Sequence, residues 1–243
     1  MKKSLYLECY SGISGDMTVA ALLDLGVDAA KLQKALETLP LDGFSTRVSR
    51  VTKAGINACD FEVVLTRDDS EQRSLAEIVD ILERSGLSAG AKALAIKIYG
   101  IIADAEAKAH GIPRNEVHFH EVGDVDSIVD IAAVSFCIDQ LGVQEVIVPV
   151  LYEGTGTVRS QHGILPVPVP AVLNIAEAYG IDLYITSTPG EFVTPTGAAI
   201  VAALRTGTRL PAEFSVLKTG LGAGKRNYEP PSLLKAVLID LVL

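Results

Sequence analysis

The order of the apolar segments along the chain constrains its fold most strongly. Short apolar runs, such as 4–10 and 145–150, alternate with longer segments whose apolar residues recur at helical spacing, such as 91–109. Strands that alternate with helices are typical of a sheet with largely parallel strands and helices packed on it. We therefore predict an α/β fold, with α+β as the alternative, in which helices flank a central, mostly parallel sheet.

Individual elements follow from the apolar spacing and from the Gly and Pro residues that interrupt it. The expected helices are 17–25, 31–39, 75–84, 91–109, 127–141, 171–178 and 198–205. The expected strands are 4–10, 45–52, 58–65, 145–150, 182–186, 213–219 and 234–243, and those between 45 and 65 form a small antiparallel pair. A polar stretch near 66–74 predicts an internal boundary. Residues 152–170, rich in Gly and Pro, predict a functional loop, and Gly220, Gly222 and Gly224 predict a turn.

Composition narrows the classes of partner and compartment. Hydrophobic residues make up 49% of the chain but aromatic residues only 5%, so Ala, Val, Ile and Leu must build most of the core. The net charge of −9 argues against a nucleic-acid partner, which requires a basic face. No segment approaches the roughly 18 apolar residues of a membrane span. Three scattered cysteines indicate a reducing compartment, and Cys9 is expected to be a buried apolar residue in preference to a thiolate ligand. We expect a soluble, cytoplasmic protein without membrane contact, and the apolar composition is compatible with a homo-oligomer.

Residues 118–126, H-F-H-E-V-G-D-V-D, hold two of the four histidines and three carboxylates. Imidazole beside carboxylate suits a borderline divalent metal such as nickel, zinc, manganese or iron. In an extended segment the first and third side chains share one face, and Gly123 lets the chain turn back toward them. The alternative is a solvated turn in which Asp126 caps the next helix. The predicted metal ligands are His118, His120, Glu121, Asp124 and Asp126.

Three further loops lie at expected strand ends, where open α/β sheets bind ligands. Backbone N–H groups of the first, S-G-I-S-G-D (11–16), can approach an anion, while Asp16 either caps the next helix or holds a cation. The second, E-G-T-G-T-V (153–158), precedes His162, which we interpret as functional in preference to a solvated loop residue. The third (190–199) places hydroxyl groups at a helix start, where capping is favoured for Thr194 alone.

These loops supply the remaining predicted site residues. The predicted cofactor-binding residues are Ser11, Gly12, Ser14, Gly15, Thr155, Gly156, Thr194, Thr196 and Gly197. The predicted catalytic residues are Asp16, His120 and His162. By contrast, His110 ends an amphipathic helix, where a histidine is favourably placed against the helix dipole.

Four segments of the chain resemble, in order, the motifs of the nickel-insertion proteins of nickel-pincer cofactor biosynthesis (the LarC family). They are Y-S-G-I-S-G-D-M-T-V-A-A-L-L-D-L-G (10–26), H-F-H-E-V-G-D-V-D-S-I-V-D-I (118–131), H-G-I-L-P-V-P-V-P-A (162–171) and F-V-T-P-T-G-A-A (192–199). The resemblance implies a nickel chelatase of the lyase class that inserts Ni²⁺, a substrate, into pyridinium bisthiocarboxylic acid mononucleotide. It also implies dependence on CTP with Mg²⁺ or Mn²⁺, and a lactate racemase-type apoenzyme as acceptor of the product.

The same resemblance implies that residues 1–243 correspond to the N-terminal, metal- and substrate-handling part of a longer protein. In that family a C-terminal domain binds the nucleotide, either in the same chain or as a separately encoded half. His118, His120 and Glu121 match the histidine–acid motif, which is implied to handle nickel. Replacing a pyridinium C–H bond by a C–Ni bond also requires a base, and a neutral histidine or a carboxylate can act as one. The alternatives are a nickel carrier without catalysis and, from H-x-H alone, a metal-dependent hydrolase.

Overall fold

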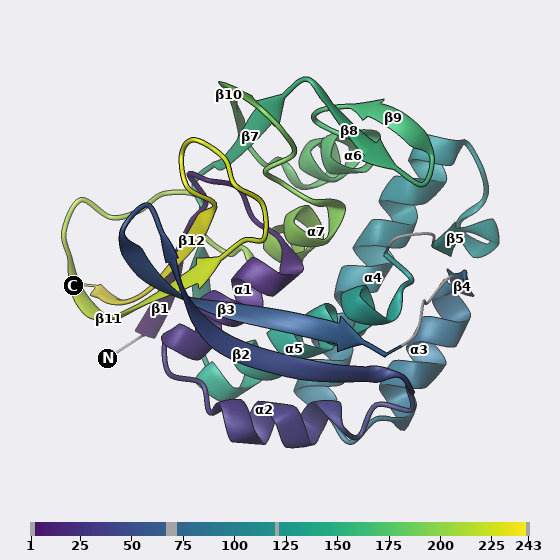
Figure 1. Cartoon of the computed structure of the whole chain (residues 1–243), viewed down its shortest axis with the longest axis horizontal. Coiled ribbons are helices and arrows are strands. Elements are labelled where there is room, and N and C mark those ends of the chain that lie inside the picture. The colour runs from purple at the N-terminus through teal and green to yellow at the C-terminus, as the bar shows by residue number, and fades with distance from the viewer. Residues whose placement is uncertain (1–2, 67–71, 120–121, 242–243) are drawn as a thin grey trace.

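The computed structural model describes residues 3–66, 72–119 and 122–241 (Figure 1). The helices are α1 (Gly15–Asp24), α2 (Ala29–Leu36), α3 (Leu75–Arg84), α4 (Ala89–His110), the 3-10 helix η1 (Arg114–Glu116), α5 (Val125–Leu141), α6 (Pro170–Tyr179) and α7 (Pro195–Leu204). The strands are β1 (Lys3–Glu8), β2 (Phe44–Lys53), β3 (Ile56–Leu65), β4 (Arg73–Ser74), β5 (His118–Phe119), β6 (Glu145–Ile147), β7 (Leu151–Thr155), β8 (Thr157–Ser160), β9 (Gly163–Pro166), β10 (Leu183–Pro189), β11 (Phe214–Ala223) and β12 (Leu233–Leu241).

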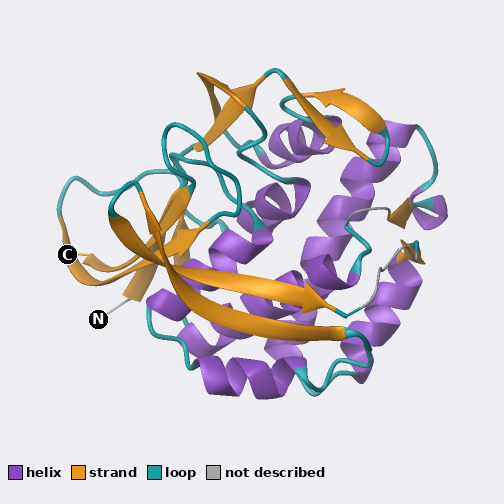
Figure 2. Cartoon of the chain, in the orientation of Figure 1, coloured by secondary structure: helices purple, strands orange, loops and turns teal. Residues whose placement is uncertain are grey.

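The predicted α/β class is confirmed, because helices and strands interleave along the chain and helices pack on the sheet (Figure 2). The main sheet has the strand order β2-β3-β11-β12-β1-β6. It is mixed: β1–β6 and β3–β11 are parallel pairs, whereas β2–β3, β11–β12 and β1–β12 are antiparallel. The predicted antiparallel pair is confirmed as β2 and β3, which run as two long neighbouring arrows in Figure 1.

The predicted Gly-rich turn at the end of the chain is wrong, because two of its glycines lie within β11. There the sheet meets the backbone of α1: a Cβ on Gly222 would lie 2.0 Å from the carbonyl oxygen of Met17, and one on Gly220 would lie 2.2 Å from that of Ala21. Glycine inside a strand is typical of such a close backbone approach. The glycines therefore let α1 pack directly on the sheet, and this fixes the helix whose first turn carries Asp16.

The segment 152–170, which was predicted to be a functional loop, has secondary structure of its own. The segment forms β7, which pairs with β10 in parallel, followed by the antiparallel hairpin β8–β9 with Gln161 and His162 at its turn. Gly156 joins β7 to β8 with a φ of +86°, a left-handed conformation that favours glycine. Pro166 is tolerated because β9 pairs on one side only, with β8. Gly and Pro thus mark turns and sheet edges here.

The core confirms the expectation from composition. Short aliphatic residues dominate it, and α7 is buried on all its faces from Thr196 to Leu204. Cys9 is 1% exposed, and burial raises the pKa of its thiol well above the ordinary value, so it packs as an apolar residue. Among the described residues, no helix is both long and apolar enough to cross a membrane. The boundary near 66–74 stays a prediction, and residues 67–71 lie outside the described part of the chain.

Candidate functional site

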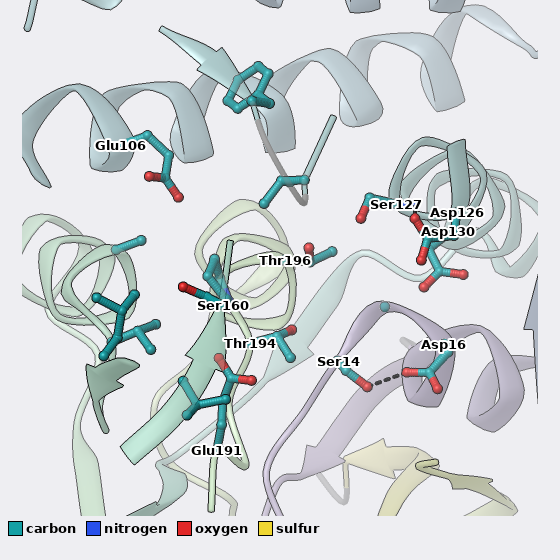
Figure 3. Close-up of a pocket in the computed structure, with 18 of the residues that line it drawn as sticks. Ser14, Asp16, Glu106, Asp126, Ser127, Asp130, Ser160, Glu191, Thr194 and Thr196 are labelled. Carbon is teal, nitrogen blue, oxygen red and sulfur yellow. Dashed lines mark hydrogen bonds between the residues drawn. The ribbon is translucent and has the colours of Figure 1, made fainter. Parts of the chain in front are cut away.

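Residues from all four sequence motifs meet at one cavity of about 1000 Å³ (Figure 3). Its walls come from the start of α1, the strand β3, the end of α4, the first turns of α5 and α7, and the β8–β9 hairpin. The predicted site residues that line it are Ser14, Gly15, Asp16, His118, Asp126, His162, Thr194 and Thr196. Side chains up to about 180 positions apart in the sequence are thereby brought into a single space.

Other predicted site residues are placed elsewhere. Within the described chain, Ser11, Gly12, Asp124, Thr155, Gly156 and Gly197 do not line this cavity. His120 and Glu121 lie outside the described residues. Asp124 occupies the N-cap position of α5 and Asp126 lies in its first turn, so the alternative that made Asp126 the cap is wrong by two residues. A ligand role for these residues stays a prediction.

Gly12 and Gly197 have a packing role that accounts for both. A Cβ on Gly12 would lie 2.0 Å from the carbonyl oxygen of Phe192, and one on Gly197 would lie 2.1 Å from that of Ile13. Between them, the Ile13 N–H donates to the Phe192 carbonyl at 2.9 Å, and the Thr194 N–H donates to the Ile13 carbonyl at 3.1 Å. These glycines therefore let the first and third loops lie directly against each other.

The cap predicted for Thr194 is confirmed. Pro195 occupies the first turn of α7, and the Thr194 hydroxyl accepts the Gly197 N–H at 3.1 Å. This hydrogen bond uses one of the N–H groups that the helix start would otherwise offer to an anion.

A buried carboxyl group that the sequence analysis did not propose as functional accepts hydrogen bonds from the loop before α7. Glu153 on β7 is completely buried, and its Oε1 accepts the backbone N–H groups of Gly154 at 2.8 Å, Phe192 at 2.7 Å and Val193 at 3.2 Å. Burial raises the pKa of Glu153, while the three N–H donors lower it. Its only sequence signal is a lone acidic residue in an otherwise apolar strand. Glu153 thus ties β7 to the loop that leads into α7.

One end of the cavity is acidic (Figure 3). Asp16 at the start of α1 accepts a hydrogen bond from the Ser14 hydroxyl. Asp130 of α5, which the sequence did not indicate, lies beside the start of α1 and lines the same cavity. The missing side chain of Gly15 makes room for this carboxylate, since a Cβ there would lie 2.6 Å from Asp130 Oδ2. Burial raises the pKa of both aspartates, and the charge of Asp16 raises the pKa of Asp130 further. Lys225, whose Nζ lies 2.5 Å from Asp60 Oδ1, carries a positive charge that lowers the pKa of both aspartates.

The other end of the cavity carries imidazole groups. His110, at the C-terminal end of α4 as predicted, also lines the cavity and packs against His162, with ring centroids 4.8 Å apart and ring planes inclined by 42°. Glu106, one turn earlier on α4, places Oε2 3.4 Å from His110 Nε2. In Figure 3, Glu106 lies on the opposite side of the view from Asp126 and Asp130. The cavity role of His110 was missed because its partner comes from a distant hairpin.

Within the described part of the chain, no three His, Cys, Asp or Glu side chains are grouped so that they could hold a metal ion. The described residues therefore provide imidazole and carboxylate donors in smaller sets. A metal held by such a set takes its other ligands from elsewhere, for example from a bound substrate or from water.

Comparisons with known proteins agree with the motifs in this cavity. The family model for nickel insertion protein matches residues 5–241. The pyridinium-3,5-bisthiocarboxylic acid mononucleotide nickel insertion protein of Alkaliphilus metalliredigens is 49% identical over an alignment that covers 99% of this chain and 61% of that protein. Its namesake from Geobacillus kaustophilus is 39% identical, over 97% of this chain and 59% of that protein. No solved structure matches the chain.

This chain spans about three fifths of the length of these curated relatives. Within that length, the match runs through every motif that lines the cavity, from the first loop to the start of α7. The chain therefore belongs to the nickel insertion protein family.

Proposed function

We propose that this chain binds nickel and a pyridinium bisthiocarboxylic acid mononucleotide and takes part in inserting the metal into it, a chelatase reaction of the lyase class. The observation that carries the proposal is the single cavity lined by residues of all four family motifs. Its volume of about 1000 Å³ lies at the upper end of the range for small-molecule sites, which suits a mononucleotide. The names of the relatives from Alkaliphilus and Geobacillus support the substrate.

The reaction needs an acceptor for one proton. A C–Ni bond replaces a pyridinium C–H bond, so Ni²⁺ enters, the C–H electron pair becomes the C–Ni bond and H⁺ leaves. We assign the proton to Asp16, since a carboxylate with a raised pKa is a stronger base than an ordinary one. Asp130 beside it disfavours a second negative charge, so uptake of a proton by the pair is favourable. His120 and His162 are the other proposed catalytic residues, and their proposed role is to contact the reacting metal and not to take the C–H proton.

The remaining proposed roles concern ligands. His118 and Asp126, which line the cavity, are proposed to contact nickel, as are His120, Glu121 and Asp124 of the same segment. Arg159, Lys225 and Arg226 also line it and offer positive charge to the substrate phosphate. The loop residues Ser14, Gly15, Thr194 and Thr196 are proposed to complete the substrate site.

For the whole protein, we propose the dependence on CTP and on Mg²⁺ or Mn²⁺ that the resemblance implies. The part of the relatives beyond this chain, about two fifths of their length, is the proposed nucleotide-binding partner. A lactate racemase-type apoenzyme is the proposed acceptor of the product, in the cytoplasm. The sequence prediction of a homo-oligomer stays a prediction.

The test is a metal-insertion assay on the purified chain. Ni²⁺ and the mononucleotide are incubated with it, with and without CTP and Mn²⁺, and the product is detected by the isotope pattern of nickel in mass spectrometry. Asp16→Asn should lower the insertion rate at least about 100-fold, because general-base catalysis contributes at least that factor. Asp80→Asn is the matched control, since Asp80 is exposed on α3, where its Oδ2 lies 3.0 Å from Arg84 Nη1. Binding of nickel and substrate without product in every arm would reduce the chain to a carrier.

A further inference from the structure

At the imidazole end of the cavity, two histidines from separate secondary-structure elements lie against each other. His110 ends the 22-residue helix α4, whereas His162 lies in the turn of the β8–β9 hairpin, and both rings border the cavity. The backbone N–H of His162 donates a hydrogen bond to the Ser160 hydroxyl at 3.1 Å, and this bond stabilises the turn. Neither helix capping nor turn formation requires that the two rings meet. Their contact therefore calls for a separate explanation.

The spacing of the rings fits two ligands of one metal ion. Metal–imidazole nitrogen bonds are about 2.0–2.1 Å, so each ring centroid of a bound histidine lies about 3.2 Å from the metal. Two such rings are then about 4.5 Å apart at a right angle between bonds and about 5.2 Å apart at a tetrahedral angle. The observed centroid distance of 4.8 Å lies between these values.

A carboxylate supports one of the two rings in the manner of a metal site. Glu106 lies one helical turn before His110, and its Oε2 is 3.4 Å from His110 Nε2. A carboxylate at that nitrogen favours the tautomer that carries its hydrogen on Nε2 and leaves Nδ1 to bind a metal. Ligating histidines are commonly oriented by such a carboxylate.

The small number of ligands suits a metal that must be passed on. A structural site with four protein ligands holds its ion closed, whereas an incomplete site leaves coordination positions open. The two thiocarboxylate sulfurs of the substrate are soft ligands that nickel accepts readily, so they can fill the open positions. A pair of imidazoles can thus hold nickel and release it to sulfur.

We infer that His110 and His162, oriented by Glu106, form the site at which Ni²⁺ is first bound before its transfer to the substrate. The inference rests on the proposed function and goes beyond it, because it places the incoming metal at the end of the cavity opposite Asp16 and outside the histidine–acid segment 118–126.

The experiment measures binding of Ni²⁺ alone to the tag-free chain, without substrate. High-spin Ni²⁺ broadens NMR signals of nearby nuclei, so the imidazole signals of the four histidines report which rings the ion approaches. The signals of His110 and His162 should broaden at the lowest nickel concentrations. In calorimetry, His110→Asn and His162→Asn should each weaken nickel binding at least about 10-fold, and the double variant should lose little more than either.

Asp80→Asn, on the exposed side of α3, is the matched control. His118→Asn tests the competing site, since it removes a cavity-lining imidazole of the histidine–acid segment. The inference is overturned if the signals of His118 or His120 broaden first, or if His118→Asn weakens binding while the other two variants bind as the wild type does. The NMR result on the unchanged chain decides even if a variant folds poorly. Failure of the proposed function looks different: nickel would bind at the histidine pair, but the mononucleotide would never be metallated.

Discussion

Replacing Glu153 tests how the wall of the cavity is held in place. Glu153→Ala removes the acceptor of three backbone N–H groups, two of which belong to the loop before α7. Each buried donor left without a partner costs about 1–3 kcal/mol. Partial relaxation of the loop recovers some of this, so we expect a loss of about 3–5 kcal/mol in the free energy of unfolding, a large share of the typical 5–15 kcal/mol.

Glu153→Gln is the matched control, because its carbonyl oxygen can still accept these N–H groups. We expect it to lose no more than about 1–2 kcal/mol. The assay is urea unfolding followed by circular dichroism, with the midpoint and slope compared among the three proteins. Equal, small losses for both variants would refute the idea that hydrogen bonding by Glu153 holds the loop.

The pH dependence of the same proteins provides an independent check. Because burial raises the pKa of Glu153 in the folded state, the folded protein keeps a proton that the unfolded chain has already lost. Its contribution to stability is therefore complete below the ordinary glutamate pKa of about 4.3 and declines as the pH rises through the raised value. Glu153→Gln cannot ionise and should lack this decline. A slope of stability against pH equal to that of the wild type would contradict the assignment.

Three further predictions concern packing, capping and charge. Gly222→Ala should lower the free energy of unfolding by about 1–3 kcal/mol or more, because the added Cβ meets the backbone of α1. The control is Gly100→Ala in α4, which should not destabilise the protein because the added Cβ meets the end of the flexible Arg114 side chain. Urea unfolding compares the two variants. Ser74→Ala removes the capping box of α3 and should lower the midpoint of thermal unfolding, at a cost of about 1 kcal/mol. Burial raises the pKa of Asp16 in the folded state, so Asp16→Asn should stabilise the chain at neutral pH. This gain over the wild type should vanish below the ordinary aspartate pKa of about 3.9, where Asp16 is protonated in both the folded and the unfolded state. Thermal unfolding at several pH values measures the difference in stability.

Elements with local signals could be predicted from the sequence. The helical spacing of apolar residues over 75–84 predicts α3, and the alternation of apolar and polar residues predicts the β2–β3 pair. Elements whose cause is distant could not. In the sequence, Gly222 resembles a turn residue. Its actual role is to let α1, about 200 positions earlier in the chain, pack closely against β11. The hairpin β8–β9 was not predicted because Gly and Pro residues usually indicate loops. Here the Gly residues lie at its turns, and Pro166 lies in a strand that pairs on one side.

The candidate site shows the same limit. Asp16 and His162 could be proposed because each stands in a loop with an unusual pattern. Asp130 and Glu153 lie within apolar segments, where a single acidic residue is significant only once its surroundings are known. For Asp130 these are the open space at Gly15 and the charge of Asp16, and for Glu153 they are backbone N–H groups from a loop about 40 positions later.

The separation of the two ends of the cavity has a chemical reason in a metal insertion. A group bound to Ni²⁺ has given its electron pair to the metal and is a poor base while it does so. The group that takes the C–H proton must therefore differ from the group that holds the incoming nickel. In the proposed mechanism, the buried carboxylates with raised pKa values take the proton, and the imidazole pair of His110 and His162, with Glu106 beside His110, holds the metal. A substrate bound between them would receive the metal from one side and lose its proton to the other, so the Asp16 and His162 variants should fail at different steps.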